Sequence, residues 1–247
     1  MFKKLVPLNK EQHQPLRIQP INGFQFAADV HVAAVMVHEF ARASAIYPIV
    51  FLEDPAQDKF YPVALLGLEQ NENLFVTEEG RWQASYIPAV IRRYPFALAR
   101  LGEDEMFTVC IDEGAELIST HEGKPLFSES GEPAEVIEQV KLYLGELQQM
   151  EVITETFCRF LKSHNLFTPL NMQVRVGNKV QNVTGCYVVN EQRFANLSDE
   201  LFLQIRHQHY LAPIYAHLTS LSRTESLAML KQGITSVSQP ADDDQVH

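Results

Sequence analysis

The pattern that most constrains this sequence is an apolar stripe between Pro133 and His164. Apolar residues recur there every three or four positions, which places them on one face of an α-helix. Pro133 suits the first helical turn, so we predict one helix from about residue 133 to 164, roughly 45 Å long. The stripe is typical of core packing rather than of a coiled-coil seam, because it lacks a sustained pattern of flanking charges. Its members are Val136, Val140, Tyr143, Leu147, Met150, Ile153, Phe157 and Phe160.

Segments with strand character lie on both sides of this helix. Before it, short apolar and β-branched runs separated by turn residues predict strands, at residues 47–52, 61–66, 74–76 and 106–111. Residues 31–45 are rich in good helix formers and predict a short helix. After it, residues 171–176 and 185–189 flank a Gly-Asn-Lys turn and predict a hairpin.

The last third of the chain predicts helices. Ser198 marks one helix start, Pro213 opens a second helix, and a third ends before Gly233. The expected fold class is therefore α+β, with a β-rich N-terminal half, one long central helix, a hairpin and C-terminal helices. We divide the chain into an extended N-terminal arm (1–22), one domain (23–232) and a disordered acidic tail (233–247), because the tail is polar and ends in Ala-Asp-Asp-Asp-Gln-Val-His.

Composition excludes several classes of protein. The chain has 20 Lys and Arg against 31 Asp and Glu, a net charge of −11, which argues against nucleic-acid or anionic-membrane partners. No window approaches the roughly 18 apolar residues of a transmembrane segment.

The N-terminal residues lack the pattern of a Sec signal, so we expect a cytoplasmic protein, with the cell surface by a non-Sec route as the alternative. Cys110, Cys158 and Cys186 are far apart and are expected to be reduced and buried.

Motifs of common enzymes are missing from the sequence. It contains no G-x-S-x-G elbow, no phosphate-binding G-x-x-x-x-G-K-[ST] loop and no G-x-G-x-x-G turn. Acidic runs at 103–105 and at Asp112-Glu113 are expected in solvated loops. We therefore expect a non-enzymatic protein without a cofactor.

A metal site is the alternative that the histidines suggest. His207 and His209 stand two positions apart, and His217 follows. On a helix, positions i and i+2 point about 200° apart, so this pair shares a face only in an extended segment. The other interpretation is a pair of histidines at a helix end, interacting with the helix dipole. The metal hypothesis implies a metal-dependent enzyme or an oxygenase-associated component.

The segment from Gly80 to Phe96 differs most from its surroundings. It holds the only tryptophan, two tyrosines and three arginines in an otherwise acidic chain. Guanidinium groups beside aromatic rings are suited to hold a carboxylate, a phosphate or an extended peptide. Alternatively, the arginines pair with acids of the chain and the rings fill the core. The candidate ligand-binding residues are Arg81, Trp82, Tyr86, Arg92, Arg93 and Tyr94.

Several segments give the sequence a family resemblance. Tyr-Pro-Ile-Val-Phe (47–51), Ala-Leu-Leu-Gly-Leu (64–68), the 80–96 block, Cys-Ile-Asp-Glu (110–113) and Ile-Tyr-Ala-His-Leu-Thr-Ser-Leu (214–221) resemble the SapC family, from about Leu5 to Leu230. This family is named for a bacterial surface-layer (S-layer) associated protein, and the resemblance supplies no catalytic residues.

Members of the family tend to be encoded beside oxygenase-like proteins and nutrient receptors, which implies an accessory role. We therefore expect an accessory protein that binds a peptide, a small anionic ligand or a protein partner through the Arg and aromatic cluster. A structural S-layer-associated protein is a further alternative, and a homodimer is one candidate assembly.

Overall fold

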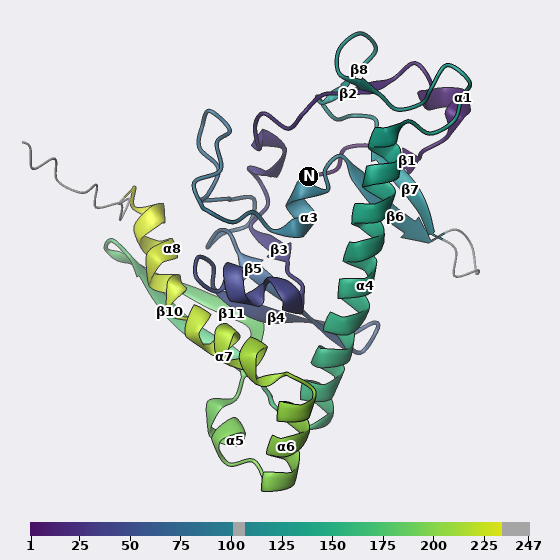
Figure 1. Ribbon diagram of the computed structural model, residues 1–247. Helices are drawn as coiled ribbons and strands as arrows, with labels where there is room; N and C mark the ends of the chain where they lie inside the picture. The colour runs from purple at the N-terminus through teal and green to yellow at the C-terminus, as the bar shows by residue number, and fades with distance from the viewer. Residues whose placement is uncertain (101–106, 234–247) are drawn as a thin grey trace, which may run out of the picture.

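The fold is built along one long helix. A computed structural model describes residues 1–100 and 107–233, and Figure 1 shows helix α4 (Glu135–Ser163) running along one side of the molecule. The long central helix predicted from the apolar stripe is confirmed. Acidic Glu135 and Glu138 lie in its first turn and Lys162 in its last, which suits the helix dipole.

The larger sheet is antiparallel and has the strand order β10-β11-β4-β5-β3. The predicted hairpin is confirmed as two long paired strands, and the predicted strands at 47–52 and 61–66 are confirmed with boundaries shifted by about two residues. The strands are β3 (Val32–Ala34), β4 (Ile49–Asp54), β5 (Lys59–Leu65), β10 (Phe167–Val176) and β11 (Lys179–Val189).

Two smaller sheets lie toward the N-terminal end of α4. One has the order β1-β7-β6, with β1 (Leu5–Pro7), β6 (Phe96–Arg100) and β7 (Phe107–Asp112). The other has the order β8-β2-β9, with β2 (Arg17–Ile18), β8 (Ile118–Ser119) and β9 (Lys124–Pro125). Residues of the predicted arm thus pair with strands that follow them by about 100 positions, while α1 (Lys10–His13) lies between β1 and β2.

Helix α4 contributes to two separate hydrophobic cores. Phe157, Cys158 and Leu161 from its C-terminal half are buried against the five-stranded sheet. Ile137 and Leu144 from its N-terminal half are buried in a second cluster with residues of β6 and β7. The helix contacts both β5 and β6, so burying its two halves fixes the two sheets relative to each other.

Helices follow the hairpin: α5 (Glu191–Ala195), α6 (Asp199–His207), α7 (Leu211–Ser220) and α8 (Arg223–Lys231). Two of them lie on the five-stranded sheet, since α7 contacts β4 and β11 and α8 contacts β10 (Figure 1). As predicted, Ser198 caps α6, since its side chain accepts a hydrogen bond from the Leu201 amide. His217 on α7 is fully buried, with Nδ1 2.8 Å from the Ile49 carbonyl oxygen and Nε2 accepting from the Val189 amide at 3.0 Å.

Residues 31–45 correct the helix predicted there. They form β3, a 3₁₀ turn (Val37–Glu39) and the short helix α2 (Phe40–Ala43). Val32–Ala34 pair with β5, and Ala33 is buried. Tertiary strand pairing therefore outweighs the helix propensity of the alanines.

The strand predicted at 74–76 is also wrong. Only Val76 makes a bridge, to Trp82, because the Asn73 side chain accepts a hydrogen bond from the Phe75 amide and turns the backbone. The acidic run 103–105 and all of the proposed tail beyond Gly233 lie outside the described residues. The division into arm, domain and tail stays a prediction.

Two further expectations concern the cysteines and membrane-spanning helices. The three cysteines are free and buried, as predicted. Among the described residues, none of the helices combines the length and apolar character that crossing a bilayer requires.

We expect His217 to set part of the acid sensitivity of the fold. Burial lowers its pKa from 6.5 to about 4. Between these two pH values the ring is protonated in the unfolded chain but neutral in the folded chain. Stability present above pH 6.5 is then lost as the pH falls toward 4, by about 3 kcal/mol. His217→Gln retains one donor and one acceptor and should remove this loss, measured by urea unfolding between pH 7.5 and 4.

The exposed His207 on α6 provides the matched control. His207→Gln should keep the pH dependence of the wild-type protein. Equal pH dependence in the wild-type and His217→Gln proteins would contradict the assignment of a neutral, buried ring.

Candidate functional site

The segment from Gly80 to Phe96 lies between the two cores. Within it, Pro88 precedes the short helix α3 (Ala89–Arg92), which leads into β6. Ile91 of α3 is buried in the core of the five-stranded sheet, whereas Ala89 is buried in the second core. The arginines that follow are therefore held at a junction whose backbone is anchored on both sides.

Trp82 belongs to a hydrogen-bonded chain of aromatic residues. Its Nε1 donates to the Tyr47 hydroxyl at 3.0 Å, and that hydroxyl donates to the Tyr86 carbonyl oxygen. The indole also packs against Phe24 and Phe75, with ring centres 5.6 and 6.4 Å away. These contacts give Trp82 a supporting role in the loop.

A buried carboxylate, Glu39, fixes the next part of the segment. Its Oε1 accepts from the Tyr86 hydroxyl at 2.6 Å and from the Ala89 amide at 2.8 Å, while its Oε2 accepts from the Met36 amide at 2.8 Å. Burial and the bond to Glu39 raise the pKa of Tyr86 well above its usual value. Glu39 thereby holds α3 in place without pairing with any of the described arginines.

The three arginines of the segment have different surroundings. The Arg81 side chain is exposed and lies 3.6 Å from a Glu79 oxygen, so it is apart from the other two. Arg92 donates from Nε to the Ile87 carbonyl oxygen at 3.1 Å. Its guanidinium carbon lies 5.8 Å from the ring centres of both Tyr86 and Tyr143, which is within the range of cation–π attraction.

Arg93 is the most unusual of them. It is partly buried, its guanidinium carbon lies 5.8 Å from the Phe2 ring centre, and its Nε is buried without a hydrogen-bond partner. Burial lowers its pKa, an effect that the charge of Glu151 partly opposes. Within the described part of the chain, neither Arg92 nor Arg93 has a carboxylate within ion-pair distance.

Arg92, Arg93 and Tyr94 line one cavity of about 230 Å³. The opposite wall comes from α4, and the arm after β2 supplies a third side. The structure thus brings together three of the six predicted site residues, while Arg81, Trp82 and Tyr86 do not line this cavity. Residues from the arm and α4 that line it include Ile18, Gln19, Ile21, Val140 and Tyr143.

Tyr94 connects the cavity to the start of the chain through Asp112. The tyrosine is stacked on Phe26 with ring centres 4.0 Å apart, and its hydroxyl donates to Asp112 Oδ2 at 3.3 Å. Asp112 also accepts from the backbone amides of Lys3, Lys4 and Gly114, at 2.9, 2.7 and 3.1 Å. Burial opposes ionisation of Asp112, but these hydrogen bonds outweigh it and hold the pKa of the carboxyl below its usual value.

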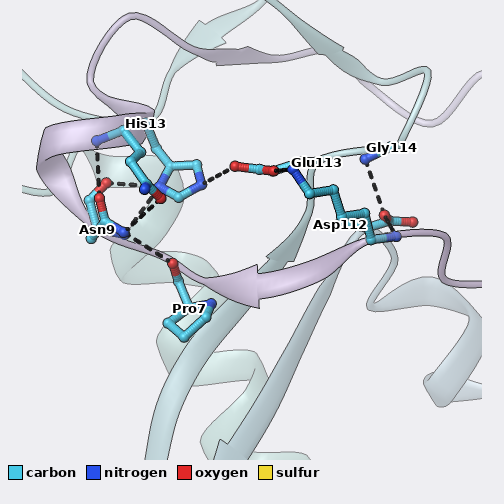
Figure 2. Close-up of polar contacts among 8 residues, drawn as sticks. Pro7, Asn9, His13, Asp112, Glu113 and Gly114 are labelled. Carbon is cyan, nitrogen blue, oxygen red and sulfur yellow. Dashed lines mark hydrogen bonds and ion pairs between the residues drawn. The ribbon is translucent and has the colours of Figure 1, made fainter.

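A second contact fastens the arm beside Asp112. Figure 2 shows the ring of His13 pointing toward Glu113, with Asn9 on its other side. His13 is fully buried, and its Nε2 lies 3.4 Å from Glu113 Oε1, close enough for an ion pair but not aligned for a hydrogen bond. The amino-terminal residues are therefore a fixed part of the cavity's surroundings.

The histidines of the metal hypothesis are separated by burial. His207 and His209 are exposed, whereas both ring nitrogens of the buried His217 already have backbone partners. Across residues 1–100 and 107–233, no three His, Cys, Asp or Glu side chains are grouped to hold a metal ion.

Sequence reasoning missed several residues that shape the cavity. Tyr143 appeared only as a member of the apolar stripe, yet its hydroxyl donates to the Ala89 carbonyl oxygen at 3.0 Å. Asp112 was expected in a solvated loop, which is wrong, since it is fully buried. The apolar residues that directly precede Asp112 were the available signal, because a charge that ends a buried strand needs internal partners.

We expect that the positive charge of Arg93 does not stabilise the fold. A partly buried charge without a counter-ion costs free energy, so Arg93→Met should leave the free energy of unfolding unchanged or raise it by up to about 1 kcal/mol. Urea unfolding measures this. Arg193 is the matched contrast, because its Nη1 donates to the Asn165 carbonyl oxygen at 2.6 Å, and Arg193→Met should lower stability by about 1–2 kcal/mol. A larger loss for Arg93→Met than for Arg193→Met would contradict this prediction.

Asp112→Asn should loosen the arm. The amide would present a donor where backbone amides and the Tyr94 hydroxyl already donate, at a cost of about 1–3 kcal/mol. Amide hydrogen exchange should accelerate at Lys3 and Lys4. Asp54→Asn is the control, since Asp54 only accepts from the exposed Ala56 and Gln57 amides, and unchanged exchange in Asp112→Asn would contradict the prediction.

Comparison with known proteins gives a match at the level of the protein family. No curated protein and no solved structure matches the chain. The family model SapC matches residues 8–227, a span that includes the 80–96 segment, Asp112 and α4. Because this match covers most of the chain, the protein belongs to the SapC family.

Proposed function

We propose that this SapC-family protein is a non-enzymatic accessory protein that binds a small anionic ligand in the cavity beside Arg92 and Arg93. One observation carries the proposal: two neighbouring arginines line a cavity without a carboxylate partner among the described residues, although the chain has 31 acidic residues. Arg92 is exposed, whereas Arg93 is partly buried. A partly buried guanidinium without an ion pair is costly, and a bound anion would supply the partner that Arg93 lacks.

The surroundings of the cavity support binding rather than catalysis. The Tyr94 and Tyr143 hydroxyls are engaged by Asp112 and by the Ala89 carbonyl oxygen. Burial raises the pKa of Tyr94 to about 12 and also raises that of Tyr143. Both phenols thus stay protonated at neutral pH, and neither is placed to act as a base.

Other proposals concern partners and location. An acidic side chain of a peptide or protein partner would offer the same carboxylate as a free ligand. A metal-dependent activity, a role in a surface layer, a homodimer and a cytoplasmic location remain predictions that rest on the sequence.

Anion-dependent stabilisation tests the proposal. Thermal unfolding is followed with benzoate, acetate or inorganic phosphate at constant ionic strength. We expect at least one of them to raise the Tm of the wild-type protein, because a ligand that binds only the folded state stabilises it. Arg93→Gln should abolish the increase.

Arg81→Gln is the matched control, since Arg81 is exposed and does not line the cavity. It should keep the full increase in Tm. The proposal fails if the three anions stabilise none of the proteins, or stabilise wild type and Arg93→Gln equally.

A further inference from the structure

The walls of the cavity are mostly apolar apart from the two arginines. Ile18, Ile21 and Leu117 line one side, and Val136, Val140 and Leu144 of α4 line the other. Such walls favour a ligand that buries hydrocarbon as well as charge.

Few hydrogen-bond donors remain free on these walls. The Tyr94 and Tyr143 hydroxyls are already engaged, and Gln19 and Gln139 each donate to a neighbouring glutamate, at 3.0 and 3.1 Å. Each glutamine keeps one amide N–H, and the two guanidinium groups are the charged donors on these walls. One guanidinium fork matches the two oxygens of a carboxylate, whereas a phosphate would turn further charged oxygens toward apolar walls.

The volume indicates how much of a ligand the cavity can enclose. An apolar cavity of about 150 Å³ accommodates benzene, and this one measures about 230 Å³. By that scale it holds about ten non-hydrogen atoms.

A neighbouring cavity of about 500 Å³ shares Gln19, Tyr94 and Leu117 with it. Its charged lining residues are Lys3, Asp29 and Glu116, and Lys3 lies 3.8 Å from Glu116. Asp29 and Glu116 compensate the positive charge of Lys3. We therefore do not expect the neighbouring cavity to attract an anion.

We propose that the ligand of the arginine-lined cavity is a monocarboxylate attached to a compact apolar body, such as a single ring on a short chain. This inference rests on the proposed anion-binding function. It adds which charged group the ligand carries and what that group is attached to. The carboxylate pairs with Arg93, and the body lies between the arm and α4.

Calorimetric titration with 3-phenylpropionate tests the inference. The comparison ligands are its uncharged amide, propionate and inorganic phosphate. We expect 3-phenylpropionate to bind at least about tenfold more tightly than each of the three, because only it offers both the charge and the ring.

Two variants separate the charge from the hydrocarbon contact. Arg93→Gln should weaken 3-phenylpropionate binding by about tenfold or more. Val140→Phe fills the apolar side of the cavity and should weaken it to a similar extent while leaving the affinity for propionate unchanged. Val152→Phe is the matched control, because Val152 is an exposed residue of the same helix, and it should change neither affinity.

The possible failures are distinguishable. If propionate or phosphate binds as tightly as 3-phenylpropionate and depends on Arg93, the anion site stands and the apolar ligand is refuted. If the amide binds as tightly as the acid, the carboxylate is refuted. If no anion shows binding that depends on Arg93, both the inference and the proposed function fail.

Discussion

The burial of α4 on two sides is the interaction on which the rest of the structure depends. Its C-terminal half fills the core of the five-stranded sheet, and its N-terminal half fills a second core beside β6 and β7. A helix of 29 residues is far longer than one such core requires. Since one rigid rod serves both cores, a change that weakens one half of α4 also affects how the other sheet is positioned.

The candidate site is a product of this arrangement. Buried acids lie close to the arginine pair, yet each is committed elsewhere: Glu39 holds Tyr86 and the start of α3, and Asp112 holds the arm and Tyr94. Carboxylates that accept several hydrogen bonds are stable inside a protein. Few of their lone pairs remain free to accept a hydrogen bond from a guanidinium. Arg93 thus has no ion-pair partner among the described residues, beside a cavity in an acidic protein.

Local patterns predicted the elements better than the site. The stripe around α4, the hairpin and the cap at Ser198 depend on spacing and on nearby side chains, and all three were predictable. Residues 31–45 and 74–76 were not, because β3 exists only through pairing with β5, and Asn73 redirects the chain at Phe75. The composition of the 80–96 segment drew attention to Arg92, Arg93 and Tyr94, which line one cavity. Nothing in the spacing could separate them from Arg81 or add Gln19 and Tyr143, which reach the cavity from distant parts of the chain.

The fastening of the arm has a consequence for biosynthesis. Asp112 accepts hydrogen bonds from the amides of Lys3 and Lys4, which lie 109 and 108 residues earlier in the chain, so during translation these amides have no such partner until β7 has emerged. The wall formed by Val136, Val140 and Leu144 is made later still. A nascent chain therefore contains the arm and the arginine pair before the wall from α4 exists, and the cavity is complete only once translation has passed the N-terminal half of α4.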